Sequence, residues 1–220
     1  KKTMSIFTSS KVLGYEDDPI LGPTGAVAVP EFNTRFTRGV LLDTMPEKFD
    51  FLVRISGYTH GTDVWLGNAR DLITSKTAAV DETIGCRDDI MIYLISRGLP
   101  EKRAFKIMES VRKGRGLPEG AEDEMRQAGV PDWYITSCKK IKYLFPKAHA
   151  VAYVMMAFRI AWFKVYHPLA FYAAYFYRRS QKGGFDAVLM TGGLDACRAN
   201  IAAIEDNENA TDNDEDLLTT

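Results

Sequence analysis

The sequence predicts a mainly helical fold with little or no β-structure, and three observations support this. Apolar residues recur at helical spacing along most of the chain. Proline and glycine stand where the predicted helices begin or end. A long apolar run over residues 148–166 is stopped by Pro168. With 220 residues, 46% apolar and 26% charged, the chain has the composition of a globular protein of one large or two small domains.

The first third of the chain contains an irregular segment followed by two predicted helices. Residues 1–33 begin with a short amphipathic stretch and continue as a loop rich in Asp, Pro and Gly. Asn33 or Thr34 is a suitable N-cap for the first helix. The segment Thr44–Glu47 fits a capping box, which predicts a second helix ending at Gly57.

The middle of the chain predicts a series of short amphipathic helices separated by glycine and proline. They are expected over residues 63–73 with Thr62 as a possible cap, 88–97, 101–113, 118–127 and 131–144. In the helix over 101–113, Phe105, Ile107, Met108 and Val111 are expected to form the buried side.

The helix over residues 148–166 is apolar on almost every side, which predicts a long helix buried in the core. Ala150, Ala157 and Ala161 form a stripe of small residues that a neighbouring helix can approach closely. Arg159 and Lys164 interrupt the run before the ~18 uncharged residues of a membrane span. The aromatic residues of the next helix, 168–179, recur at helical spacing and are also expected in the core.

The start of this long helix is a candidate anion site. Pro146 suits a helix entry, and the first-turn amides that follow are expected to point outward without partners. Lys147 and His149 flank these amides, a combination that favours phosphate. The alternative is that Lys147 is an ordinary exposed lysine and His149 a capping or core-edge histidine.

Two further segments have the residue types of a phosphate-binding surface. Residues 56–63 contain hydroxyls, two glycines and His60, although the alternative is a plain turn between helices. The segment 97–115 holds seven basic residues against two acids, which suits a nucleic-acid backbone or, alternatively, a solvated helix face.

The charge of the chain is unevenly distributed, although the net charge is only −1. Residues 205–220 hold seven acids and no Lys or Arg, which predicts a disordered acidic tail. The remaining 22 acids face 28 basic residues, so residues 1–204 carry +6. Residues 181–204 predict a weak helical extension. Three isolated cysteines and three scattered histidines predict no zinc site and suit a reducing cytoplasm.

Several of these motifs together resemble a known family. In residue type and in order, these motifs resemble segments of the PolC-type alpha subunit of DNA polymerase III. The motifs are Val53–Gly57, His60–Ala69, Arg97-Gly98-Leu99, and Phe145–His149 followed by Ala152-Tyr153. The match runs from about residue 3 to about residue 180. The matching region is the fingers domain of this replicative polymerase of low-GC Gram-positive bacteria.

The resemblance implies a division of the chain and a set of binding residues. Residues 1–33 would lead in from the palm domain, and residues 34–180 would form the helical core of the fingers. This core would bind the incoming nucleoside triphosphate (dNTP) and primer-template DNA. The expected contacts are Arg54, Ser56, His60, Thr62, Arg97, Arg103, Lys113, Arg115, Phe145, Lys147 and His149.

The resemblance places the chemistry outside this chain. The metal-binding aspartates of the family lie in the palm, and Asp17-Asp18 and Asp88-Asp89 do not match that motif. We therefore expect no catalytic or metal-binding residue here, no cofactor bound by this segment, and Mg²⁺ as the cofactor of the parent enzyme. The expected partners are DNA, dNTP, the palm and, through other regions, replisome proteins such as the sliding clamp.

The expected location is the cytoplasm, in association with the nucleoid and with no membrane. Two alternatives come from different classes of protein. One is a free-standing helical scaffold or regulator that binds an acidic partner, and the other is a peripheral membrane protein.

Overall fold

The computed structural model describes residues 1–16, 18, 21–181, 185–207, 209–211 and 214, and these residues confirm the predicted helical class, with no strand among them. The only β-type pairings in this part of the chain are two isolated bridges. The elements are α1 (Lys2–Ser5), η1 (Lys11–Leu13), α2 (Arg35–Thr44), α3 (Phe49–His60), η2 (Trp65–Ala69), α4 (Arg70–Thr74), α5 (Arg87–Ser96), α6 (Glu101–Arg112), α7 (Ala121–Gln127), α8 (Asp132–Lys140), α9 (Lys147–Tyr166), α10 (Pro168–Ser180), α11 (Ala187–Thr191) and α12 (Leu194–Glu205).

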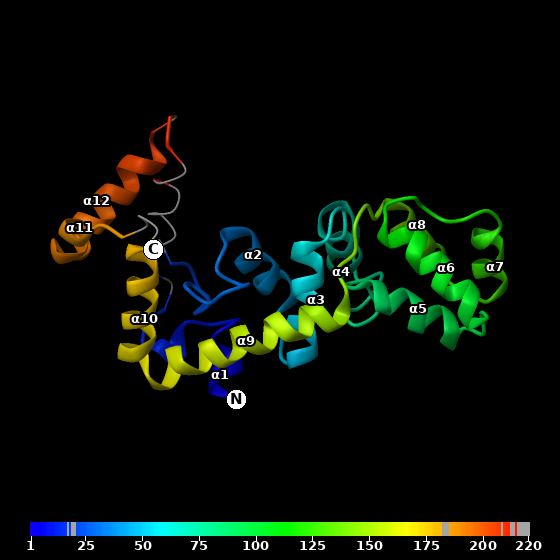
Figure 1. Cartoon of the computed structure of the whole chain (residues 1–220), viewed down its shortest axis with the longest axis horizontal. Helices are drawn as coiled ribbons and strands as arrows, with labels where there is room; N and C mark the ends of the chain where they lie inside the picture. Colours follow the sequence, from blue (N-terminus) through cyan, green and yellow to red (C-terminus); the bar gives the residue numbers. More distant parts are fainter. Residues whose placement is uncertain (17, 19–20, 182–184, 208, 212–213, 215–220) are drawn as a thin grey trace.

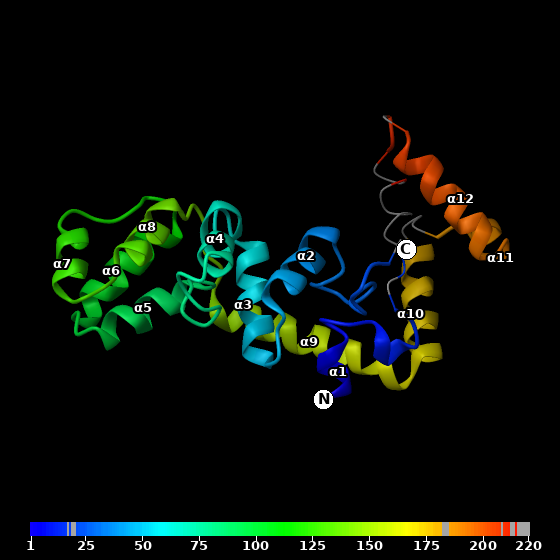
Figure 2. The same cartoon turned by 180° about the vertical axis from the view of Figure 1, so that it is seen from behind.

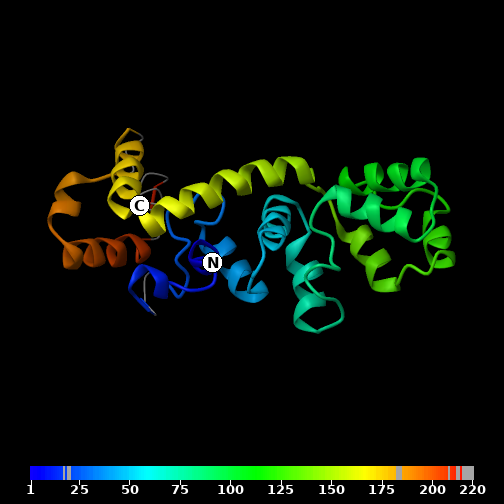
Figure 3. The same cartoon turned by 90° about the horizontal axis from the view of Figure 1, so that it is seen from below.

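The molecule is elongated, and α9 runs along its middle (Figure 1). Helices α5 to α8 form a lobe at one end, and α10 to α12 lie at the other. The view from behind shows α2 and α3 between these ends (Figure 2), and the view from below shows the chain start beside α9 (Figure 3). A single buried apolar cluster extends from Ile6 to Ala161 and includes residues of the lobe.

The boundary between α2 and α3 differs from the sequence prediction. Thr34 does cap α2, because its hydroxyl accepts the Thr37 amide at 3.1 Å. The capping box at Thr44–Glu47 is wrong, since the Thr44 hydroxyl donates back to the Val40 carbonyl inside α2. Met45 then ends α2 in a left-handed conformation, and α3 starts only at Phe49. The segment Thr44–Glu47 has the residue order of a capping box. Its backbone does not have the required conformation, because Thr44 is still part of α2.

Helix α3 continues through Gly57 to His60, so the predicted end at Gly57 is also wrong. A Cβ atom at Gly57 would lie only 2.1 Å from the Gly85 carbonyl oxygen. This glycine therefore allows the segment around residue 85 to approach α3 closely, and it does not end the helix.

The predicted helix over residues 63–73 is replaced by a turn and one short helix. Leu66, Gly67 and Asn68 have non-helical backbone angles, and α4 covers only Arg70–Thr74. Thr62 caps no helix, because its backbone forms a bridge with Tyr143. The side chain of Asn68 reaches Ser137 on α8, which ties this turn to the lobe.

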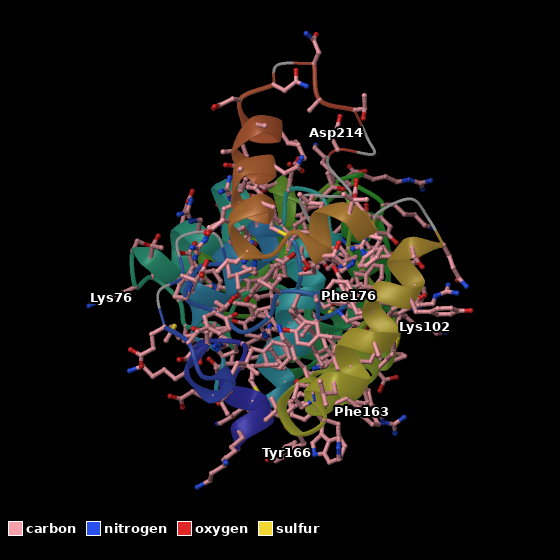
Figure 4. All side chains as sticks on the ribbon, turned by 90° about the vertical axis from the view of Figure 1, so that its left-hand side faces the viewer. Lys76, Lys102, Phe163, Tyr166, Phe176 and Asp214 are labelled. Carbon is pink, nitrogen blue, oxygen red and sulfur yellow. The ribbon has the colours of Figure 1, made fainter. Side chains whose placement is uncertain are left out.

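The long helix α9 is present as predicted, but only one of its faces is buried. The small-residue stripe packs inward, with Ala150, Val154, Ala157, Ala161 and Lys164 all buried. Trp162 and Phe163 are more than 40% exposed, so the prediction of a helix buried all round is wrong. Figure 4 shows Phe163 and Tyr166 beside the bend after α9. Among the described residues, α9 is the one helix that is long and apolar enough to be a possible membrane span. This criterion uses length and composition alone, and 28% of its apolar 18-residue stretch is buried in the structure.

Other expectations of burial are also corrected. Phe105 is exposed on α6, whereas Ile107, Met108 and Val111 are buried as predicted. Among the α10 aromatics only Phe171 is buried, whereas Tyr172 and Tyr177 are exposed, and α10 packs on α9. The region predicted as a weak helical extension contains α11 and most of α12. Most of the predicted disordered tail lies outside the described residues.

Candidate functional site

The start of α9 is joined to the start of α5 by two hydrogen bonds that backbone amides donate. The Arg87 amide donates to the Phe145 carbonyl at 3.1 Å. The Lys147 amide donates to Asp88 Oδ2 at 2.8 Å. The prediction that all first-turn amides of this helix are unpaired is therefore wrong for Lys147, because a carboxylate of the same chain already occupies part of the anion position.

The Lys147 ammonium lies between two further carboxylates. Its Nζ is 3.6 Å from Asp50 Oδ1 on α3 and 3.8 Å from Asp89 Oδ1 on α5. Asp89 is rigidly held, since its other oxygen accepts the Gly85 and Cys86 amides at 3.0 and 2.9 Å. These distances to Lys147 exceed the 2.7–2.9 Å of a tight charged hydrogen bond. The ammonium is therefore neutralised without being tightly bonded.

Arg54 lies beside Asp89 and is bound to it. Its Nη1 donates to the Thr83 carbonyl and, at 3.2 Å, to Asp89 Oδ2, and only 10% of the side chain is exposed. Burial by itself lowers the pKa of Arg54, but the nearby acids, Asp89 foremost, outweigh it and raise that pKa above its ordinary value. Arg54 is thus a permanent cation that ties the segment before α5 to α3.

A row of aromatic rings begins at the end of α3 and continues along α9. The His60 ring stacks on Phe145 with centroids 5.3 Å apart, and Phe145 meets His149 edge-on at 4.8 Å. Tyr153, one turn further along α9, lies 4.5 Å from His149. His60 Nδ1 donates to the Ser56 carbonyl at 2.9 Å, and its Nε2 lies 3.1 Å from Glu31. His60, His149 and Tyr153 are exposed, so the row lies at the surface.

Three of the predicted residues line one cleft of about 490 Å³. Arg54 and Lys147 line the cleft from α3 and α9, and Arg97 lines it from the end of α5, with its guanidinium 5.0 Å from the centre of the Tyr93 ring. Acidic residues, among them Asp81 and Asp89, share the lining, so the cleft carries both signs of charge. A larger apolar groove of about 690 Å³ lies between α9 and α10 and contains none of the predicted residues.

The remaining basic candidates lie in the lobe and are not equivalent. Arg103 is bound to Glu124 at 2.6 Å and to the Glu119 carbonyl at 2.8 Å. Lys113 pairs with Glu109 at 3.1 Å. Arg115 is exposed, and no side-chain partner is found for it among the described residues. Figures 1 and 2 place α7 at the outer end of the lobe. The end of α6 lies nearer the start of α9, because the Leu144 amide donates to the Arg112 carbonyl at 3.3 Å.

The two predicted hydroxyl residues, Ser56 and Thr62, lie close to His60 in the chain but differ in solvent exposure. Ser56 is 1% exposed, and its Oγ has no hydrogen-bond partner within the part of the chain that the structure describes. Thr62 is exposed, and its amide donates to the Tyr143 carbonyl at 3.0 Å. This bridge holds the turn after α3 against the segment that leads into Phe145.

Sequence reasoning missed four residues of this site: Asp50, Asp88, Asp89 and Tyr153. Tyr153 stands four residues after His149, a spacing that places both on one helix face. Asp89 stands three residues after the N-cap of α5, where an acid is favoured. Asp50 and Arg54 are also four residues apart on α3. These local signals are present in the sequence. They do not show that α3, α5 and α9 meet, because that is a tertiary contact between distant segments. Among the described residues no three His, Cys, Asp or Glu are grouped as a metal site.

Comparison with known proteins identifies the family. Residues 1–130 match the model of the bacterial DNA polymerase III alpha subunit finger domain. The DNA polymerase III PolC-type of Caldanaerobacter subterraneus subsp. tengcongensis is 54% identical over 220 residues, covering all of this chain and 16% of that protein. Those of Pediococcus pentosaceus and Listeria innocua are 54% and 53% identical over 217 residues, each covering 98% of this chain and 15% of the relative.

These matches extend the resemblance beyond residue 180 to the whole chain, which spans about one sixth of the length of its relatives. The chain therefore belongs to the family of bacterial DNA polymerase III alpha subunits, as part of the finger domain.

Proposed function

We propose that this chain is the fingers part of a PolC-type replicative DNA polymerase and that it binds the incoming dNTP and the primer-template. A palm domain outside these 220 residues would catalyse nucleotidyl transfer with Mg²⁺. The identity of 54% over all 220 residues is the observation that carries the family assignment. The arrangement around Lys147 supports the nucleotide-binding part.

The start of α9 has the groups that a nucleotide requires. Lys147 supplies a positive charge at a helix N-terminus, where phosphate oxygens are favoured. His149 and Tyr153 present exposed rings on the adjoining helix face, and Phe145 lies between His149 and His60. Rings of this kind pack against a sugar or a base without reading its sequence. Phosphate and ring contacts would thus come from consecutive turns of one rigid helix.

For the primer-template, the structure favours some basic residues over others. Arg97 and Arg115 are exposed, whereas Arg103 and Lys113 are already engaged by acids. An exposed guanidinium binds a phosphate oxygen without first breaking an ion pair. We infer that Arg97 and Arg115 make backbone contacts and that Arg103 mainly stabilises the lobe. Such contacts are independent of base sequence and weaken with salt.

Replacement of Lys147 by Ala in the full-length polymerase tests this proposal. We expect KM for dNTP to rise about 10- to 100-fold, the range for losing a hydrogen bond between charged groups. Lys142→Ala is a matched control, because it removes the same charge from an exposed position five residues earlier. Steady-state kinetics on a primed template give both constants. Unchanged KM and kcat in Lys147→Ala would refute the role of this lysine.

A further inference from the structure

The two acids beside the Lys147 ammonium differ in how firmly they are held. Asp89 accepts three hydrogen bonds from its surroundings, and its side chain is 14% exposed. The Asp50 side chain is 57% exposed, and Lys147 is its only ion-pair partner among the described residues. One acid therefore belongs to the framework, whereas the other is free to move.

The geometry of the Asp50–Lys147 pair suits a contact that exchanges easily. The two charged atoms are 3.6 Å apart, and the lysine side chain is 35% exposed. Exposed ion pairs of this kind contribute little, because water and salt compete with them. A triphosphate carries several charges and forms shorter hydrogen bonds, so it is the stronger partner for the same ammonium.

Asp50 is also positioned to be left without its partner at low cost. It lies in the first turn of α3, where the N-terminal end of the helix dipole stabilises a negative charge. Solvent reaches the carboxylate when the lysine leaves. Asp89 keeps its three donors in the same event, so the framework of the site is preserved.

We propose that Asp50 is an intramolecular competitor of the nucleotide for Lys147. Without nucleotide the aspartate holds the ammonium, and the triphosphate displaces it on binding. This inference rests on the proposed function of Lys147. Because a binding-competent state that is only partly populated weakens apparent affinity, Asp50 raises KM for dNTP. It is a positioning residue, since it acts through Lys147 and touches no reacting atom.

The test is Asp50→Asn in the full-length polymerase. We expect KM for dNTP to fall about two- to fivefold, the range for an exposed ion pair, with kcat changed by less than about twofold. In a Lys147→Ala background the same substitution should leave KM unchanged. The decrease should also become smaller as salt is raised, because salt already weakens the pair. Asp43→Asn is the matched control, since Asp43 is a partly exposed acid paired with Arg70.

The arms of the experiment separate the two proposals. No effect of Lys147→Ala on KM refutes the proposed role of Lys147 in nucleotide binding. A raised KM in Lys147→Ala together with an unchanged or raised KM in Asp50→Asn overturns the competitor role alone. An equal decrease in the Lys147→Ala background also overturns it. Asp50→Ser is a second variant that keeps a residue suited to a helix start, so a folding defect in one variant leaves the test intact.

Discussion

Two lysines on α9, 17 residues apart, show how differently one side chain type is used at the two ends of a helix. Lys147 is partly exposed and lies near two carboxylates. Lys164 is 2% exposed and donates to the Gly25 and Val27 carbonyls. The rings of Phe171 and Tyr172 lie 5.8 and 5.9 Å from its ammonium.

The comparison teaches that the neighbours decide whether a lysine acts as a charge or as a structural donor. Burial, with a smaller contribution from Arg38, lowers the pKa of Lys164 to about 8. Two carbonyl oxygens accept hydrogen bonds from its ammonium, and no carboxylate among the described residues pairs with it. Lys164 thereby fastens the chain start to the end of α9. Lys147 keeps partial contact with water and is available to exchange one anion for another.

The largest expected effect is on stability at Lys164. Lys164→Ala should lower the free energy of unfolding by about 2–4 kcal/mol, because two carbonyls lose their donor and a cavity remains. Urea denaturation of the chain measures this. Arg159→Ala, on the exposed side of the same helix, is the control and should change stability by less than about 0.5 kcal/mol. A loss below about 1 kcal/mol at Lys164 would remove the distinction between the two lysines.

A somewhat smaller effect is expected from the fixed acid beside Lys147. Asp89→Ala should cost about 2–3 kcal/mol, since it removes the acceptor of two amides and the charge partner of a buried guanidinium. Asp88→Ala should cost about 1 kcal/mol, because Asp88 accepts one hydrogen bond, from the Lys147 amide, and lies 3.8 Å from the Arg87 guanidinium in a partly exposed position. Thermal unfolding of both variants compares them. Equal losses would contradict the inference that Asp89 is held more firmly than Asp88.

The pH dependence of stability provides a third comparison. The folded-state pKa of Lys164 is about 8 and the unfolded value 10.5, so the unfolded chain binds more protons between these values. Its contribution to stability therefore rises with pH from about 8 to about 10.5. Lys164→Met should lack this rise. Buried Cys86 and Cys138, whose pKa is raised to about 12, titrate in both proteins and cancel in the difference. A difference curve without a slope in this window would contradict the burial of a charged Lys164.

The smallest expected change is in the stability of Lys147→Ala. Its long and partly exposed ion pairs predict a change below about 1 kcal/mol in the free energy of unfolding. Urea unfolding of this variant beside Lys164→Ala completes the comparison. A loss of stability as large as that in Lys164→Ala would show that Lys147 is a structural residue. A change in the KM of Lys147→Ala for dNTP would then no longer demonstrate a direct contact with the nucleotide.

Much of the local structure was predictable because short-range chemistry determines it. Glycine after α6, proline at the start of α10 and the Thr34 cap all occupy their predicted places. The same reasoning failed at Gly57, which looks like a helix end. Its lack of a Cβ instead admits the Gly85 carbonyl. The sequence alone does not distinguish a glycine that permits close packing from a glycine that ends a helix.

The candidate site was only partly predictable for a related reason. Phe145, Lys147 and His149 stand together in the chain, so their proximity followed from helix geometry. Asp50, Asp88 and Asp89 come from two other helices, and nothing in their spacing indicates that they meet Lys147. The anion position at the start of α9 therefore looked vacant in the sequence and is partly filled in the fold.

The sequence by itself determined the helical class, most helix positions and the family, because helical periodicity, proline, glycine and residue order are local properties of the chain. Tertiary structure decided which face of α9 is buried and which carboxylates surround Lys147. Burial and charge pairing depend on neighbours brought together from distant positions, and an apolar helix does not specify which of its sides another helix will cover. The small-residue stripe was covered, and the large aromatic side chains remained exposed.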